Sequence, residues 1–593
     1  MRTRLGAFLF TFAIFIVLAS CEVVIKQKLD HGFLADLILH APKSLHGWRV
    51  HVLFSTPVNK IDIWDAHVVQ SLNNGREFVI ANKNYNKDLR SGETIKMEIE
   101  AHTSIHALPT ASLYFEGFQT SGQPTTASLS SHVTTTPMTS HHGGGNNKYN
   151  YTKLLGDSIL FYEAQRSGKL PTDNRIPWRG DSALGDKGDH GEDLTGGWYD
   201  AGDHIKFNFP MGASVTLLTW GLLKFKDAYV TSDQLDHMYS CIKWPLDYFL
   251  KCWEPTRQEL YVQVGKGKID HDVFGRAEDM TMPRPAYKVT AAHPGSDVAG
   301  QMAAAMAAGA IAFETKDKAY ATKLLTAAKS LYEFAKAHHG KYSDSVTDAK
   351  EFYGSSGFRD ELALAAVWLF KASKESQYLQ EAEQYVATDT AWALDWDDKG
   401  VAAQMLLYEV TKDNKYSGMV EDFLKDFMPG GTVQYTPCGL VFRDKWGPFS
   451  YAANAAMLAL IAAEDGLHPD SYRAWAEGQI AYMLGNNKYH MSFVVGYGSK
   501  YPLHVHHAGS TCPNPPATCD WGTFDSPAPN AHVLYGALVG GPDGQDNYKD
   551  VRNDYIHNEV ACDYNAGFQS AVAGLLHLQH RNQLPAPSLH GCT

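Results

Sequence analysis

The 593-residue sequence contains no dense run of lysine or arginine, and its formal net charge is −13. Proteins that bind nucleic acid or anionic membranes concentrate positive charge, so neither partner is expected. The cysteines are scattered and lack the tight CxxC or HxxxH clusters of a zinc site. Beyond the N-terminus, no apolar segment is long enough to cross a membrane.

The N-terminus predicts the compartment of the protein. Two arginines precede an apolar run over residues 5–18, and small residues follow it. This pattern is typical of a secretory signal peptide, assigned here to residues 1–20, and predicts a secreted, extracellular protein. In an oxidising compartment some cysteines should pair, and Cys512 and Cys519, which flank a proline-containing loop, are the preferred local pair.

A chain of this length favours two domains, and a polar tract divides it. Residues 119–147 are rich in Ser, Thr, Pro and Gly and predict a flexible linker. Residues 21–118 contain short alternating runs separated by turn signals, which predict an all-β sandwich. Residues 148–593 contain many long, Ala-rich, helix-periodic segments, such as 451–464, which predict an all-α domain with long irregular loops.

Two distant segments carry the carboxyl groups of interest. The stretch GGWYDAGDHIKF, residues 196–207, places Asp200 and Asp203 among glycines that allow close approach of a ligand. The stretch YKDVRNDYIHNEVACDYNAGF, residues 548–568, contains Glu559 among several tyrosines. Hydrolysis of an acetal needs one carboxylic acid and one carboxylate that differ in protonation at one pH. Each segment alone also suits a turn, a calcium loop or a helix cap.

A third stretch, SFVVGYGSKYPLHVHHAGS (492–510), adds glycines and histidines. Together the three resemble the family-9 glycoside hydrolases, which are endoglucanases with an (α/α)6 barrel, over residues 149–593. The family's aromatic, acidic and small positions in the last stretch are all matched, at Tyr548, Asp550, Tyr555, Glu559, Ala561, Asn565 and Ala566.

The resemblance implies a role for each matched residue. Asp203 would be the general base that deprotonates water, Asp200 would help to hold that water, and Glu559 would be the general acid. The family inverts the anomeric centre, so the carboxyl groups should lie roughly 6.5–9.5 Å apart. The residues implied to contact the sugar are His271, Phe274, Trp392, Trp446, His506, Asp550 and Tyr564.

Two arginines expected from the family pattern are absent. The usual HHR motif ends here in Ala508, and the usual WGxxR motif ends in Ser450. Because arginine makes fixed, forked hydrogen bonds, its loss would weaken glucan binding or shift the pKa of the acid, with His504 as a partial substitute. The alternatives are therefore a catalytically weakened cellulose-binding protein, or a glucanase that prefers mixed-linkage β-glucan.

The chemistry requires no cofactor, but a structural calcium ion is one expectation. Ser356, Asp360 and Glu361, with Asp397, resemble the calcium ligands of some family members, and oxygen ligands suit Ca²⁺. The alternative is that Asp360 and Glu361 are ordinary acids in the first turn of a helix.

The N-terminal domain resembles family-2 carbohydrate-binding modules, which bind cellulose through a flat row of three aromatics. Trp64 and Tyr85 match two of those positions, Leu29 stands at the third, and Trp48 is expected in the core. The sequence thus predicts a secreted, monomeric, modular endo-β-1,4-glucanase that acts on cellulose or a related β-glucan.

Overall fold

The structure is a computed structural model. The chain forms two compact units, of which the first ends at His142 and the second begins at Gly143. None of the helices in the described part of the chain is long and apolar enough to span a bilayer. The described residues are 22–29, 32–41, 43–63, 66–73, 75–83, 87–90, 93–103, 111–115 and 148–585.

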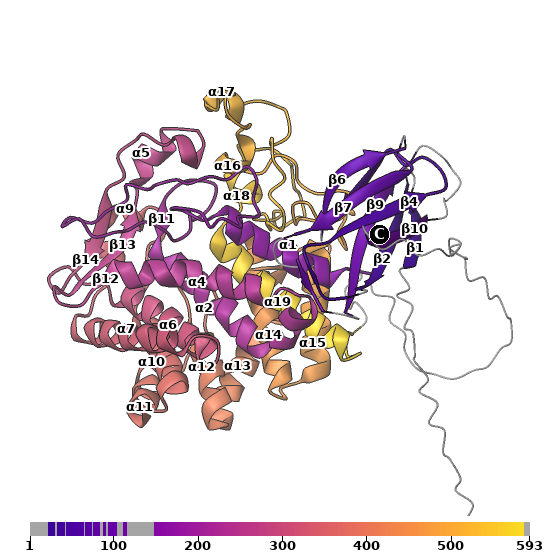
Figure 1. Ribbon diagram of the computed structural model, residues 1–593. Helices are drawn as coiled ribbons and strands as arrows, with labels where there is room; N and C mark the ends of the chain where they lie inside the picture. Colours follow the sequence, from indigo (N-terminus) through magenta and orange to yellow (C-terminus); the bar gives the residue numbers. More distant parts are fainter. Residues whose placement is uncertain are drawn as a thin grey trace, which may run out of the picture. The chain divides into compact units, whose positions relative to one another are not determined.

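The first unit is a β domain with two four-stranded antiparallel sheets, visible in indigo in Figure 1. A third, two-stranded sheet pairs β3 (Leu45–His46) with β8 (Asp88–Leu89). In sheet order, the first contains β1 (Glu22–Leu29), β2 (Gly32–His40), β9 (Thr94–His102) and β5 (Lys60–Ile63), and the second contains β10 (Ala111–Phe115), β4 (Arg49–Phe54), β7 (Glu77–Asn82) and β6 (Ala66–Leu72).

The two sheets contribute to one hydrophobic core. Alternation along β4 buries Val50, Val52 and Phe54, as the two-residue period of a strand requires. The ring of Phe54 meets that of Phe33 on β2 edge-on, with centroids 6.0 Å apart. Trp48 is 4% exposed and belongs to this core, as expected. The predicted cellulose contacts Trp64 and Tyr85 lie outside the described residues.

The second unit is mostly helical, which confirms the all-α prediction for this part of the chain. Six helices pack against one another in the order α14, α19, α2, α6, α10 and α12. These inner helices are α2 (Asn208–Lys224), α6 (Ser296–Phe313), α10 (Arg359–Ser373), α12 (Gly400–Thr411), α14 (Pro448–Glu464) and α19 (Cys562–His580).

An outer set of helices packs against the inner ones. Inner and outer helices differ in composition because they differ in burial. The inner helix α6, with the sequence SDVAGQMAAAMAAGAIAF, is buried on all sides, whereas the outer helix α13 (Asn414–Phe427) buries one face, at Tyr416, Val420 and Phe427. The outer helices are α1 (Tyr151–Ala164), α4 (Leu235–Cys252), α7 (Lys318–Ala337), α11 (Ser376–Tyr385), α13 (Asn414–Phe427) and α15 (Pro469–Met483).

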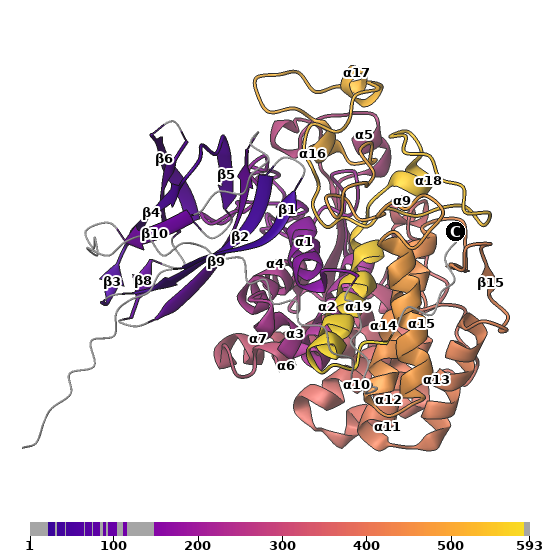
Figure 2. The same ribbon diagram turned by 90° about the vertical axis from the view of Figure 1, so that its right-hand side faces the viewer.

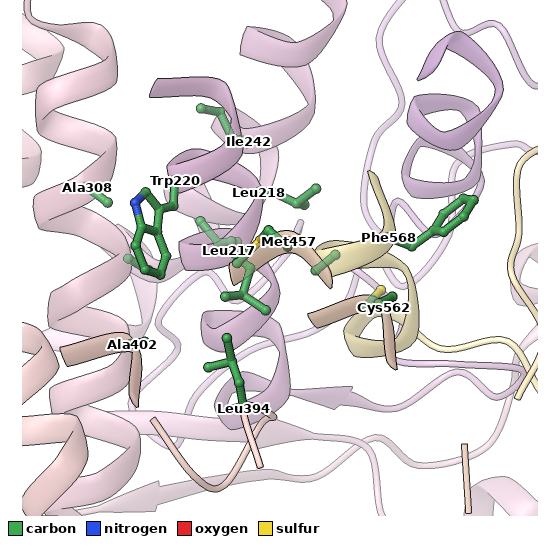
Figure 3. Packing of buried hydrophobic residues seen from close by; sticks show 14 of the residues in the cluster. Leu217, Leu218, Trp220, Ile242, Ala308, Leu394, Ala402, Met457, Cys562 and Phe568 are labelled. Atoms are coloured by element: carbon green, nitrogen blue, oxygen red, sulfur yellow. The ribbon is translucent and has the colours of Figure 1, made fainter. Parts of the chain in front are cut away.

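Small residues allow the inner helices to approach closely. Figure 3 shows Leu217 and Leu218 of α2 in the core, with Met457 of α14 and Phe568 of α19. Beside them, a Cβ placed on Gly567 of α19 would lie 2.8 Å from the Cα of Asn454 on α14. Alanine and glycine therefore set the helix spacing as well as the helix propensity.

Long connections gather at one end of the helical unit. Figures 1 and 2 both show α5 (Gly267–His271), α16 (Ala508–Thr511), α17 (Trp521–Phe524) and α18 (Tyr555–Asn558) together at the upper end. The remaining short elements are α3 (Lys226–Thr231), α8 (Tyr342–Ser345), α9 (Thr347–Lys350), β11 (Lys206–Phe207), β12 (Trp253–Glu254), β13 (Glu259–Val264), β14 (Ala286–Val289), β15 (Gln434–Tyr435) and β16 (Val441–Phe442). A disulfide joins Cys512 to Cys519 between α16 and α17, as predicted.

Substituting Gly567→Ala should destabilise the helical unit, although alanine is the better helix former. The added methyl group would overpack the contact with α14, at a cost of about 1–3 kcal/mol in the free energy of unfolding. The thermal unfolding midpoint should fall accordingly.

The matched control is Gly418→Ala in α13, where a Cβ would meet no other described atom within 4 Å. Here the substitution should leave the midpoint unchanged or raise it. Equal effects at the two positions would contradict the packing argument.

Candidate active site

The loops at this end surround one cavity of about 690 Å³ in the helical unit. Its wall combines segments that lie hundreds of positions apart in the sequence. The residues singled out in the sequence that line it are Asp200, Asp203, His271, Phe274, Trp446, His506, Glu559 and Tyr564.

Backbone hydrogen bonds join the carboxyl-bearing loops directly. The N–H of Ala508 donates to the carbonyl of Gly202 (2.8 Å), and the N–H of Cys562 donates to the carbonyl of Asp200 (2.9 Å). Such bonds fix positions because a buried backbone group left without a partner is costly. The loop of the two aspartates is therefore fastened to both other motif segments.

Gly202 is required by this contact. A Cβ at this position would lie 2.3 Å from the carbonyl oxygen of His506. The same His506 donates its N–H to the carbonyl of Asn558 (2.9 Å), just before Glu559. The glycine of the GGWYDAGD motif thus lets three chain segments meet at van der Waals distance.

Asp200 is buried and hydrogen-bonded. The hydroxyl of Tyr353 donates to its Oδ2 at 2.5 Å, while its Oδ1 has no partner among the described residues. Burial, followed by the negative charges of Asp203 and Asp563, raises the pKa of Asp200 well above its ordinary value. The protonated form is therefore favoured.

Asp203 is paired with an imidazole ring. Nε2 of His271 lies 3.3 Å from Oδ2 of Asp203. This hydrogen bond is the largest cause that raises the pKa of His271 to about 9, so the ring is an imidazolium at neutral pH. A positive charge therefore lies directly beside the Asp203 carboxyl group.

Glu559 precedes α19 and is enclosed by the cavity wall. Burial, followed by the negative charge of Asp203, raises the pKa of Glu559 to about 8. At neutral pH it consequently holds a proton that it can donate. The cavity thus combines a protonated carboxyl group with an aspartate beside a cation.

The two histidines of the HH pair have different surroundings. Nδ1 of His506 lies 2.9 Å from the carbonyl of Arg552, and burial lowers the pKa of His506. A neutral ring that donates from Nδ1 leaves Nε2 as an acceptor. His507 instead places Nε2 2.8 Å from Oε1 of Gln165 and helps to hold the loop.

Aromatic side chains form much of the rest of the wall. Trp446 is 46% exposed, and its ring lies 5.6 Å from that of Tyr555. Phe274 packs on Trp521, with centroids 5.6 Å apart, and Tyr564 also lines the cavity. Partly exposed rings of this kind can stack on flat, neutral ligands.

Two of the predicted sugar-contacting residues lie outside the cavity wall. Trp392 is exposed, with the guanidinium of Arg443 4.4 Å above its ring. Asp550 accepts hydrogen bonds from the backbone N–H and the ring of His504 and so orders that loop. His504 is not among the described residues that line the cavity.

The positions of the expected arginines, Ala508 and Ser450, are buried and line the cavity. Among the residues that the structure describes, the wall contains neither lysine nor arginine. Polar recognition by the side chains of this wall therefore depends on carboxyl groups, imidazoles, hydroxyl groups and indole N–H groups.

Sequence reasoning missed several wall residues. Asp270 is 4% exposed and directly precedes His271, so adjacency to a candidate histidine was an available signal. Tyr353, which donates to Asp200, lies in a segment without any motif. Trp521 also lines the cavity, and only its proximity to a motif segment could have indicated this.

The four residues expected to hold calcium lie beside Lys399. Its Nζ lies 3.1 Å from Oε1 of Glu361, and its backbone N–H donates to Oδ2 of Asp360 (2.7 Å). Oε2 of Glu361 is buried and has no partner within the described part of the chain. Burial and the charge of Asp360 raise the pKa of Glu361 well above its usual range. Among the described residues, the carboxylate oxygens of Asp360, Glu361 and Asp397 do not converge as a metal-binding group, so the unpartnered Oε2 of Glu361 is the observation that favours a cation here.

The pairing of Ser356 with Asp397 supports the same grouping. The backbone N–H of Ser356 donates to Oδ1 of Asp397 at 2.9 Å, which brings the two loops together. Asp360 and Glu361 also lie in the first turn of α10. The acids expected at a helix start and the expected calcium ligands are therefore the same residues.

The chain is similar in sequence to known proteins. The sequence model of glycosyl hydrolase family 9 matches residues 151–572. Endoglucanase A of Bacillus pumilus is 45% identical over 458 residues, which cover 74% of this chain and 68% of that protein. Endoglucanase 14 of Arabidopsis thaliana is 40% identical over 459 residues, which cover 72% and 93% of the two chains.

Solved structures agree in fold. The endoglucanase of the termite Nasutitermes takasagoensis has a TM-score of 0.71 and 50% identity, covering 73% of this chain and all of that one. The cellulase Cel9M of C. cellulolyticum in complex with cellobiose has a TM-score of 0.68 and 36% identity, covering 72% and 99%.

Proposed function

This chain belongs to glycosyl hydrolase family 9 and is an enzyme of the cellulase class, and on that basis we propose that it cleaves internal β-1,4-glucosidic bonds of cellulose with inversion of configuration. One observation carries the proposal: Glu559, protonated at neutral pH, lines the same cavity as Asp203, which lies beside an imidazolium. An acid and a base in different environments are what acetal hydrolysis requires.

In this mechanism Glu559 protonates the glycosidic oxygen as the bond to the anomeric carbon breaks. Asp203 takes a proton from a water molecule that attacks the opposite face of the sugar, which inverts the configuration. Asp200 helps to hold that water. After one turnover Glu559 regains a proton and Asp203 releases one to solvent.

The assignment of the base to Asp203 instead of Asp200 rests on their partners. Asp200 accepts a hydrogen bond from Tyr353, and its raised pKa favours the protonated form. Asp203 has the positive charge of His271 next to it. A base must be ionised before the reaction, so Asp203 is the better candidate.

Aromatic rings and neutral hydrogen-bonding groups support a glucan as the substrate. Trp446, Phe274 and Tyr564 offer flat faces, and Nε2 of His506 can accept a hydrogen bond from a sugar hydroxyl. The weakened cellulose-binding protein gains no support, because all three carboxyl groups line the cavity. A glucanase that prefers mixed-linkage β-glucan would use the same three groups and is distinguished by a panel of substrates.

Substituting Glu559→Gln or Asp203→Asn should lower hydrolysis of carboxymethylcellulose by about 10²–10⁴-fold, because each removes one proton-transfer group. A reducing-sugar assay measures the loss, and NMR of the first product should show the α-anomer. Glu375→Gln, at the exposed N-cap position before α11, is the control and should retain full activity. Retained activity in the Glu559 variant, or a β-anomer formed first, would contradict the mechanism.

The pH profile of the wild type provides the second readout of the same prediction. Glu559 must be protonated, so activity should be lost as the pH rises through its pKa of about 8. A rate that stays constant well above this pH would exclude Glu559 as the acid.

We also propose that residues 21–118 form a β-sandwich that binds cellulose through Trp64 and Tyr85, in a protein secreted by means of residues 1–20. The two sheets with a common core and the Cys512–Cys519 disulfide support this proposal. The combined Trp64→Ala and Tyr85→Ala variant should lose most binding to microcrystalline cellulose in a sedimentation assay, while Val69→Ala, at an exposed position on β6, should not. Equal binding by both variants would contradict the module's role.

A structural calcium ion held by Ser356, Asp360, Glu361 and Asp397 is the remaining proposal, and it would stabilise the loops before α10 and α12. Calcium should raise the thermal unfolding midpoint relative to EDTA, by linkage worth about 2.7 kcal/mol at 100 times the Kd. Glu361→Gln should abolish this difference. Glu477→Gln, at another buried glutamate with a raised pKa, should preserve it. Identical midpoints of the wild type in calcium and EDTA would exclude the ion.

A further inference from the structure

One group of side chains in the cavity offers more metal-ligand atoms than the proposed reaction uses. Asp203, Asp270 and His271 each present one ligand atom, and these atoms all lie within 4.8 Å of one another. Nε2 of His271 and Oδ2 of Asp203 are 3.3 Å apart. Two carboxylates and an imidazole thus converge at the cavity wall.

Asp270 provides the second observation. It is 4% exposed and lines the cavity. Its Oδ1 accepts a hydrogen bond from the backbone N–H of His204 (3.3 Å), whereas its Oδ2 has no partner among the residues the structure describes. Oδ1 of Asp203 is also buried and unpartnered within the same described part. Buried carboxylate oxygens without partners are rare unless a ligand or proton satisfies them.

We propose that Asp203, Asp270 and His271 form a binding site for a divalent transition metal such as Zn²⁺. Two donors bound to Zn²⁺ at ~2.0–2.1 Å with a tetrahedral angle lie ~3.3 Å apart, which matches the His271–Asp203 separation. The imidazole favours a transition metal over Ca²⁺ or Mg²⁺.

A second group with similar composition does not have this property. His190, Glu192 and Glu259 also converge, but Arg257 pairs with Glu192, and Lys288 lies 3.0 Å from Glu259. Their carboxylates already face cationic side chains at the surface. This cluster therefore provides a matched negative control.

Metal binding at the proposed site must displace protons. Carboxylates and imidazoles bind Zn²⁺ only in their deprotonated forms, so affinity for Zn²⁺ should rise with pH. The other titratable and charged groups that act on His271 and Asp270 are Glu559, His506 and Arg284.

A metal at this position would take up the carboxylate that is proposed to activate water. Zn²⁺ should therefore inhibit hydrolysis, and the inhibition should strengthen as the pH rises. The inhibition rests on the proposed role of Asp203, whereas the binding does not. The decisive experiment accordingly measures binding without substrate.

Isothermal titration of the metal-free full chain with ZnCl₂ should give saturable binding at this site, tighter at pH 7.5 than at pH 6.0. Asp270→Asn and His271→Gln should each weaken binding at least about tenfold, and His190→Gln should not. Circular dichroism checks that each variant is folded. Absent binding, or equal affinity in all variants, would overturn the proposal.

Cobalt and calcium provide independent readouts. Co²⁺ bound to the wild type should give a visible absorption spectrum typical of low coordination number, and His271→Gln should remove it. Calcium that competes with equal affinity would overturn the assignment to a transition metal. Zinc binding in a chain inactive on cellulose would refute only the proposed function; activity without binding would refute only this inference.

Discussion

Mutual repulsion among buried carboxyl groups is the constraint on which this site depends. Asp200, Asp203, Asp270, Glu559 and Asp563 all line one cavity, and the charge of Asp203 contributes to the raised pKa values of Asp200, Asp270 and Glu559. Because these groups cannot all ionise in a poorly solvated space, protons distribute among them. Protonated and ionised carboxyl groups can then coexist in one cavity, as the proposed acid–base mechanism requires.

Such crowding is costly, so the frame must hold the groups together. The inner helices provide rigid ends for the loops, and backbone hydrogen bonds from Ala508 and Cys562 fasten the aspartate loop to its neighbours. Gly202 removes the side chain that would otherwise separate them. The packing of the helical core therefore keeps these mutually repelling carboxyl groups close together in the loops at its end.

Sequence patterns predicted the helical domain well because Ala-rich segments with helical periodicity favour closely packed α-helices. The motif segments, read through their family resemblance, led to Asp203, Glu559 and His506 at one cavity. Contacts created only by folding escaped this reasoning: Tyr353 beside Asp200 has no motif, and the orientation of Trp392 depends on the stacked Arg443. The raised pKa of each carboxyl group likewise depends on burial, which no local pattern contains.

A wall that lacks lysine and arginine in the described part of the chain has a consequence for the conditions in which the protein can work. Glucans are uncharged, so ions in the medium have little attraction between protein and polymer to weaken. Dispersion and stacking on Trp446 and Tyr564 persist at high ionic strength, since Debye screening acts only on charges. Retention of the polymer should thus tolerate high concentrations of simple monovalent salts.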